Sequence, residues 1–408
     1  MHYANGNKTR CQDVLPEQMA SCSDLNTTAF LERLIRLESP DLIVFTGDNI
    51  FYYAGNATAS MDAAFGPAVS SRIPWAAVLG THDRPSTLSS EEVMKHIVTM
   101  NGSLSQLNPP GYTIDGFGNY NLEVGGVEGS SLHNKSVLNL YFLDSGGTSD
   151  VPSIPGYDWI KLSQQLWFKI TSDELEKAFR KEPEPQKESA PGLVYFHIPL
   201  PEYATVKSSN IVGVKQENVK SASMNSGFFT TMKERGDVKA VFTGHDHIND
   251  FCGNLMGIHL CYGGGFGYNG YGKEGWARRA RVVLAALEQT DEGAWGAVSS
   301  IKTWKRLDDS DLSLVDSQVL WSNKEPPSTT NQTLTRRHHG HIITRMSMSG
   351  ASPLLVCCHP WKTFAMCGCI FMWVGFVMCT CIFMWVRLWV ASVGSGSGHQ
   401  SKSSTGKS

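Results

Sequence analysis

Four short apolar runs in the first 250 residues have the length and composition of buried β-strands. They are Leu42–Thr46, Trp75–Leu79, Leu193–Phe196 and Val238–Thr243. Short apolar runs bounded by turn residues are typical of strands that are covered on both faces. Two further segments alternate apolar and polar residues and predict antiparallel strands, Tyr120–Val127 and Ser136–Asp144. The same reading predicts later strands over Met256–Tyr262, Arg279–Leu287 and Val298–Leu307.

Helices are predicted between these strands. Apolar residues from Phe30 to Leu37 recur on one helical face, and Asn26–Thr28 can cap that helix. Ser89–Glu92 caps a second helix that runs through Met100. Helices are also predicted over Gln164–Lys181 and Gly227–Arg235, with a proline-broken surface loop over Glu182–Pro191. This mixture of strand–helix alternation and β-meander predicts an α/β sandwich of two facing sheets.

Each of the four apolar runs is followed by a short polar signature. The signatures are Gly47-Asp48-Asn49, Gly80-Thr81-His82-Asp83, the single His197, and Gly244-His245-Asp246-His247. One such signature alone is usually a turn or a surface group. Four in series indicate that several strands deliver carboxylate and imidazole groups to one edge of a sheet, which suits a two-metal hydrolase.

The chemistry assigns a role to each signature. Two metal ions about 4 Å apart need a carboxylate that bridges them, and Asp48 is the candidate. His197, His245 and His247 are candidate metal ligands, while His82 is placed to contact a phosphate or to protonate a leaving oxygen. Other histidines are expected to be structural or on the surface, namely His96, His133 and His259, and Arg336–His341 reads as a solvated basic run.

Composition and charge narrow the class of protein. Of 408 residues, 41% are hydrophobic and 18% charged, which fits a folded chain. The net charge of −3 provides no general basic field, so we expect no nucleic-acid partner.

Cysteines and glycosylation sequons point to the secretory pathway. Cys11/Cys22 and Cys252/Cys261 are locally spaced pairs that can be disulfides or buried free thiols. Six Asn-x-Ser/Thr sequons occur, at Asn7, Asn26, Asn56, Asn101, Asn134 and Asn331. No signal peptide is visible after Met1, so we expect a truncated N-terminus.

The character of the chain changes after residue 322. Residues 323–362 read as a polar linker, and Thr363–Val386 holds 24 residues without a charge, long enough to span a bilayer. Within that segment Cys367–Val374 recurs as Cys379–Val386, which favours an abnormal tail as the alternative to a membrane helix. Residues 387–408 form a low-complexity tail.

The signatures carry a resemblance to a known family. Together with Phe196–Tyr203 and Gly244–Phe251, the series resembles the calcineurin-like metallophosphoesterases, and among them the purple acid phosphatases, over residues 1–322. The resemblance implies a four-layer α/β/β/α sandwich, a dinuclear centre of iron with zinc or manganese, and hydrolysis of phosphate monoesters of small substrates. It also implies an extracellular or vacuolar location. It makes Asp48 the bridging ligand and His82 the substrate contact. It assigns the remaining histidines to the two ions, His2 with His247 and His197 with His245.

Three positions depart from the family pattern. Met1-His2 match the last two positions of the family's Asp-x-His, so the Asp ligand and the first core strand are expected to be missing. Thr81 stands where the family has a metal-binding Asn, and Phe51 where coloured members have a Tyr. The sequence therefore predicts an impaired phosphatase. Its alternatives are a nucleotide phosphodiesterase of the same fold, or an inactive remnant that the C-terminal segment can tether to a membrane.

Overall fold

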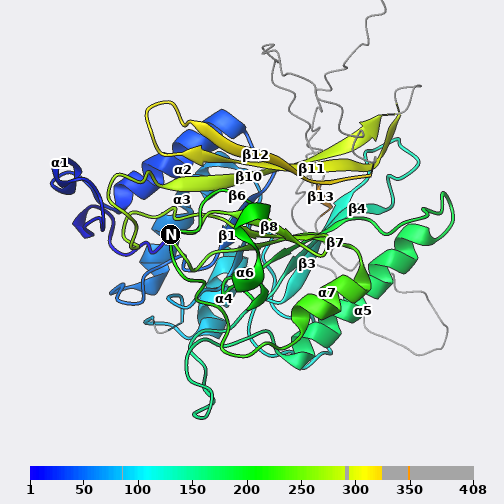
Figure 1. Ribbon diagram of the computed structural model, residues 1–408, viewed down its shortest axis with the longest axis horizontal. Helices are drawn as coiled ribbons and strands as arrows, with labels where there is room; N and C mark the ends of the chain where they lie inside the picture. The colour runs from blue at the N-terminus through cyan, green and yellow to red at the C-terminus, as the bar shows by residue number, and fades with distance from the viewer. Residues whose placement is uncertain (85, 290–293, 324–347, 350–408) are drawn as a thin grey trace, which may run out of the picture. The chain divides into compact units, whose positions relative to one another are not determined.

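The computed structural model describes residues 1–84, 86–289, 294–323 and 348–349 (Figure 1). Most of the predicted linker, the uncharged segment 363–386 and the tail lie outside these residues, and so do Arg336–His341 and Asn331. Within the described ranges, no helix has the length and apolar character needed to cross a membrane.

A mixed sheet of eight strands forms the centre of the fold. Its strand order is β13-β3-β4-β5-β7-β9-β8-β6, and β4, β5, β7 and β9 are mutually parallel. The strands are β3 (Tyr120–Gly125), β4 (Ser136–Phe142), β5 (Gly192–Tyr195), β6 (Ile211–Val212), β7 (Val238–Thr243), β8 (Cys252–Leu255), β9 (Ile258–Tyr262) and β13 (Met348–Ser349). β3 pairs with β4 antiparallel, as the alternating patterns predicted.

Two smaller sheets accompany the central one. β1 (Ile43–Thr46) and β2 (Trp75–Val78) form a parallel pair. β10 (Arg279–Gln289), β11 (Trp295–Leu307) and β12 (Leu314–Ser322) form an antiparallel meander. The chain start makes an isolated parallel bridge from Tyr3 to Ile50, which follows β1.

The side chains of β4 show how the layers are arranged. Leu140 and Phe142 belong to one buried cluster, with residues of the smaller sheets, while Tyr141 between them belongs to another. Alternate residues of a strand point to opposite faces, so the central sheet is covered on both sides.

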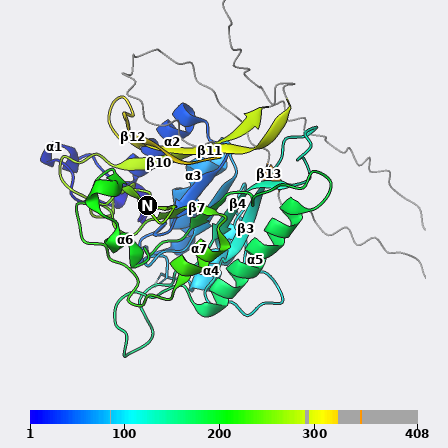
Figure 2. The same ribbon diagram turned by 45° about the vertical axis from the view of Figure 1, so that its right-hand side comes forward.

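Helices complete the two outer layers (Figure 2). α5 (Leu162–Arg180) and α7 (Phe228–Arg235) cover the second face of the central sheet, and α2 (Asp24–Glu38) packs against α3 (Ala57–Ser71) beyond the smaller sheets. This is the predicted α/β/β/α sandwich. The remaining helices are α1 (Pro16–Met19), α4 (Ser90–Thr99), α6 (Glu202–Thr205), η1 (Gly6–Lys8) and η2 (Ser208–Asn210).

One local prediction was wrong, and one helix was missed. The cap of α2 is Ser23, whose side chain accepts from the backbone nitrogen of Leu25, while Asn26 lies at the third helical position and completes a capping box. Helix α3 was not predicted, because its Ala, Ser and Gly residues give no clear apolar period and Pro67 lies inside it. It is capped by Asn56 and buries Met61 and Phe65.

Both cysteine pairs form disulfides. Cys11 and Cys22 close a short loop before α2, and Cys252 and Cys261 join β8 to β9 at directly paired positions. Cys252 and Cys261 are fully buried, so this bridge is part of the core beside β7.

Candidate metal centre

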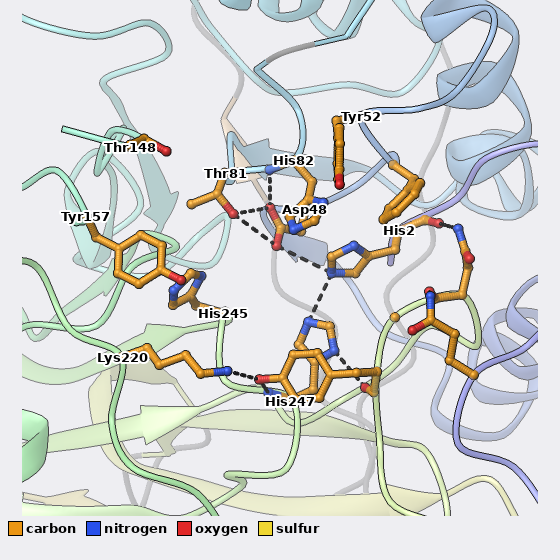
Figure 3. A pocket seen from close by; sticks show the side chains of 15 residues that line it. His2, Asp48, Tyr52, Thr81, His82, Thr148, Tyr157, Lys220, His245 and His247 are labelled. Atoms are coloured by element: carbon orange, nitrogen blue, oxygen red, sulfur yellow. Dashed lines mark hydrogen bonds and ion pairs between the residues drawn. The ribbon is translucent and has the colours of Figure 1, made fainter. Parts of the chain in front are cut away.

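The parallel strands bring the predicted residues to one cavity. Asp48 follows β1, Thr81 and His82 follow β2, His197 follows β5, and His245 follows β7. The cavity has a volume of about 440 Å³ and is lined by predicted residues from both halves of the chain: His2, Asp48, Thr81, His82, His245 and His247 (Figure 3). His197 lies behind this wall at 1% exposure.

Glycines in the signatures permit close approach of the backbone. Gly47 has a φ of +87°, and a Cβ there would lie 2.6 Å from Nδ1 of His197. A Cβ on Gly80 would collide with the backbone nitrogen of Asp48. Only glycine therefore allows these turns to meet around Asp48.

Three candidate ligands adopt left-handed backbone conformations. His2, Asp48 and His245 have φ values of 56°, 50° and 74°. Such a conformation costs about 1–3 kcal/mol for a residue with a side chain, and it persists where the surrounding structure enforces it. Three of the described residues with this conformation therefore meet at one cavity.

Asp48 occupies the centre of the cluster. Its Oδ2 lies 3.4 Å from Nε2 of His2 and 3.1 Å from Nε2 of His197. Its Oδ1 accepts from the backbone nitrogen of His82 at 2.7 Å and from Oγ1 of Thr81 at 3.2 Å. Burial alone would raise the pKa of Asp48, but His197 and His2 hold that pKa well below its usual value. Asp48 is therefore an ionised carboxylate within reach of imidazoles on two sides.

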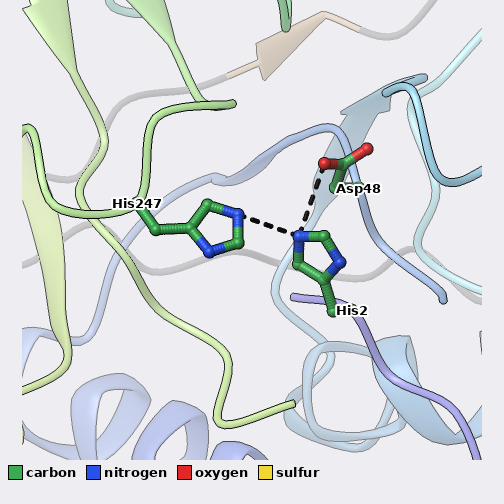
Figure 4. A group of neighbouring side chains, drawn as sticks. All are labelled: His2, Asp48 and His247. Carbon is green, nitrogen blue, oxygen red and sulfur yellow. Dashed lines mark hydrogen bonds and ion pairs between the residues drawn. The ribbon is translucent and has the colours of Figure 1, made fainter. Parts of the chain in front are cut away.

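The histidines form two groups that share Asp48. Ligand atoms of His2, Asp48 and His247 lie within 4.8 Å of one another, and so do those of Asp48, His197 and His245. In the first group Nε2 of His2 and Nε2 of His247 face each other at 3.0 Å (Figure 4). In the second, Nδ1 of His245 is 3.2 Å from Nε2 of His197.

This donor set fits a pair of metal ions. Nε2 of His245 is buried without a hydrogen-bond partner, and ring nitrogens of the four histidines converge on one carboxylate. Imidazole and carboxylate ligands suit zinc, iron and manganese.

The protonation states also suit metal binding. Burial lowers the pKa of His245 and of His247 to about 3 and that of His2 well below its usual value. His197 differs, because the charge of Asp48 outweighs burial and raises its pKa. Neutral imidazole is the form that binds a metal, so three of the four histidines already hold that form near neutral pH.

Backbone carbonyls orient two of the rings. Nδ1 of His197 donates to the carbonyl of Thr46 at 2.8 Å, and Nδ1 of His247 donates to the carbonyl of Tyr271 at 2.8 Å. In each ring the other nitrogen is thereby directed to the cluster, as outer contacts of metal-binding histidines do.

Asp83 holds the first two signatures together. It is fully buried and accepts from Nδ2 of Asn49, from the backbone of Ile50 and from that of Gly80, at 2.8 to 3.0 Å. Asn49 and Asp83 therefore fix the turn geometry that places Asp48 beside His82.

Several cavity residues carry no local sequence signal. They come from loops: Gln12, Tyr52, Thr148, Tyr157, Lys220, Asn269 and Tyr271. The histidines predicted to be structural lie elsewhere. His96 contacts Asp62 at 2.8 Å, and His133 contacts the carbonyl of Ser130.

Comparisons with known proteins point to one family. The calcineurin-like phosphoesterase family matches residues 21–249 of the chain. Two Arabidopsis thaliana proteins, named "Probable inactive purple acid phosphatase 29" and "14", are 62% and 55% identical over 79% of this chain, covering 84% and 82% of their own lengths. "Phosphatase DCR2" of Saccharomyces cerevisiae is 32% identical over 79% of this chain and 55% of its own length. The family match begins after His2, and the structure brings His2 into the cluster.

Proposed function

The chain belongs to the calcineurin-like phosphoesterase family, and on that premise we propose that it hydrolyses monoesters of small phosphorylated substrates at two metal ions around Asp48. The main support for the proposal is that Asp48 belongs to both groups of candidate metal ligands. A bridging carboxylate of this kind is what a two-metal site requires.

Each ion would have its own pair of imidazoles. His2 and His247 would hold one, His197 and His245 the other, and the donor chemistry fits iron with zinc or manganese. When bound, such ions polarise phosphoryl oxygens and activate water for in-line attack.

His82 supplies the substrate contact in this proposal. Its backbone nitrogen holds Asp48, its ring lines the cavity, and its Nδ1 is buried without a partner. Burial lowers its pKa, so the ring is neutral near pH 7 and its N–H can donate a hydrogen bond to a phosphoryl oxygen, whereas protonation of the leaving oxygen would require the imidazolium form.

We propose that the activity is impaired relative to a site with Asn at position 81. The hydroxyl of Thr81 is directed to Asp48, and it is shorter than an amide. Changes in outer-shell partners of a metal cost about 10–100-fold in affinity or activity, so a changed ligand should cost at least as much. The word "inactive" in the names of the Arabidopsis relatives is consistent with such a loss.

A nucleotide phosphodiesterase is the second candidate, favoured by an aromatic wall beside His82. Phe51 lies 4.7 Å from Tyr52, and Tyr52 lies 3.8 Å from Tyr53, measured between ring centroids. Tyr53 is 74% exposed, which leaves its ring free to stack on a nucleobase.

A secretory or vacuolar route is part of the proposal. The purple acid phosphatase relatives suggest it, and two disulfides form and persist in an oxidising compartment.

The test uses the full chain and its Asp48→Asn variant. We would measure bound metal together with phosphate release from p-nitrophenyl phosphate and from bis(p-nitrophenyl) phosphate. We expect both metal and monoester turnover in the wild type and neither in the variant. Faster turnover of the diester would favour the phosphodiesterase, and bound metal without turnover would identify an inactive protein.

A further inference from the structure

The loop between β6 and α7 is held against the last metal-binding signature. Asp246 accepts from the backbone nitrogen of Lys220 at 3.2 Å. Asn249 accepts from the backbone nitrogens of Gln216 and Glu217 at 3.0 and 3.1 Å. Asp246 is 2% exposed and Asn249 fully buried. These positions, which the two-metal reading leaves without a role, therefore fix the loop that forms one wall of the cavity.

The loop presents an ammonium group to the cavity. Nζ of Lys220 lies 3.0 Å from Oε2 of Glu217 and 3.1 Å from the hydroxyl of Tyr271, and the side chain remains 43% exposed. An ammonium has three donors, and these contacts use two of them. The third can reach a ligand without loss of the contacts that hold the side chain in place.

Tyr271 sets the distance between this ammonium and the metal-binding atoms. Its ring stacks on that of His247 with centroids 4.0 Å apart, and its hydroxyl accepts from the backbone nitrogen of His247 at 3.1 Å. Lys220 contacts the same hydroxyl, so it lies at the backbone end of His247. Nε2 of His247, at the other end, faces His2. Lys220 is therefore separated from Nε2 of His247 by that imidazole side chain (Figure 3).

Polar groups from a second loop lie on the same side of the cavity. Thr148 and Tyr157 line it, and Tyr157 packs edge-on against His245 with centroids 4.4 Å apart. The backbone nitrogen of Ser223 donates to the carbonyl of Tyr157 at 3.0 Å, which ties this loop to the one that carries Lys220. This side of the cavity is thus hydroxylic and cationic, whereas the side at His82 is aromatic.

We propose that Lys220 is the cationic residue of a second subsite, which binds the further phosphate of substrates that carry two phosphate groups. The proposal rests on the proposed function, because that function would place the first phosphate at the two metal ions around Asp48. The second phosphate of the substrate would contact Lys220 together with the hydroxyls of Thr148 and Tyr157. Lysine binds phosphate as a point charge, and a charge-assisted hydrogen bond is about twice as strong as a neutral one.

The test compares two non-hydrolysable ligands that differ in one phosphonate. Binding of propane-1,3-bisphosphonate and of propylphosphonate to the metal-loaded full chain is measured by calorimetry, alongside hydrolysis of the matching phosphate esters. We expect the bisphosphonate to bind about tenfold more tightly to the wild type. Lys220→Met should remove that advantage and leave propylphosphonate binding unchanged.

Lys207→Met is the matched control, because it removes the same charge at an exposed position outside the cavity. Thermal melting checks that Lys220→Met is folded. Equal weakening of both ligands would place Lys220 at the first phosphate and overturn the proposal, as would no bisphosphonate preference in the wild type. Failure of the proposed function is recognised separately, as a bisphosphonate preference without hydrolysis of either ester.

Discussion

The two histidine groups around Asp48 are constructed in different ways. His197 and His245 follow β5 and β7, which are neighbours in the central sheet with Tyr195 paired to Phe242. A paired sheet therefore sets the spacing of these two ligands. We call this the sheet-held group.

The other group depends on contacts between distant segments. The backbone nitrogen of His2 donates to the carbonyl of Asp48 at 2.7 Å, and Nδ2 of Asn269 donates to the carbonyl of His2 at 2.8 Å. His247 is braced by Tyr271. We call His2 and His247 the loop-held group. Loop contacts open at lower free energy than paired core strands, so the ion of this group should be lost first.

Asp48→Asn should have the largest effect, because it removes the one residue that both groups share. The neutral amide keeps the shape of the side chain but not the charge between the ions. We expect loss of both metals and a fall in activity beyond the ~100-fold that an outer-shell change costs. Metal analysis after gel filtration provides the measurement. Retention of one full metal equivalent would mean that the groups do not depend on a common bridge.

His197→Ala and His2→Ala separate the two groups. We expect His2→Ala to keep the ion of the sheet-held group, and His197→Ala to lose that ion and to lower the melting temperature more. His197 is buried, and its Nδ1 donates to the carbonyl of Thr46. Truncation to alanine therefore leaves a cavity next to Asp48, and such a cavity lowers the stability of the core.

Timed removal of metal by a chelator tests the same difference in the unmodified chain. We expect two phases, of which His2→Ala lacks the faster one. A single phase in the wild type, or loss of the slower phase in His2→Ala, would contradict the comparison.

Thr81→Asn should strengthen metal retention. An amide oxygen reaches further than the hydroxyl that now contacts Asp48, so we expect metal affinity and turnover to rise about tenfold or more. Thr81→Val is the control, since it keeps the shape of threonine and has no ligand atom. Chelator competition measures the affinity. Equal values for the Asn and Val variants would show that position 81 takes no part in binding.

Tyr271→Phe should have the smallest effect, confined to the loop-held group. The ring that stacks on His247 stays, while the hydroxyl that contacts its backbone nitrogen and Glu217 is lost. A typical hydrogen bond contributes about 0.5–1.5 kcal/mol, so we expect the faster phase of metal loss to accelerate a few-fold.

Tyr157→Phe removes a hydroxyl next to His245, in the sheet-held group, and serves as the matched control. Acceleration of both phases in Tyr271→Phe would point to a general loosening of the site.

The strand ends could be predicted because their signal is local. β1, β2 and β7 lie within the predicted apolar runs, and β5 overlaps its run with a shift of one residue. The polar residues that follow each run are therefore placed at the end of a strand. His197 and His245 follow neighbouring parallel strands of the central sheet, whereas Asp48 follows β1 of the smaller parallel pair, so two sheets and not one edge bring the three residues together. The sandwich follows from the same patterns.

The remainder of the site depends on contacts that no local pattern records. His2 reaches the cluster through residues 48 and 269, and Lys220 reaches it through Asp246. The resemblance to a family identified His2, whereas nothing in the sequence identified Lys220 or Tyr271. Helix α3 was missed for a related reason, because its small residues are buried by packing partners and not by a clear period of their own.

The bridge between Cys252 and Cys261 has a consequence for how the protein is prepared. It closes the β8–β9 hairpin only a few residues after His247, and a disulfide across so short a loop stabilises a fold by about 2–3 kcal/mol. A recombinant chain made in a reducing bacterial cytosol would lack this constraint next to its ligands. The protein should therefore be produced in the periplasm or in a eukaryotic secretory host before metal content and activity are measured. A reduced sample that loses its metal would otherwise be mistaken for an inactive enzyme.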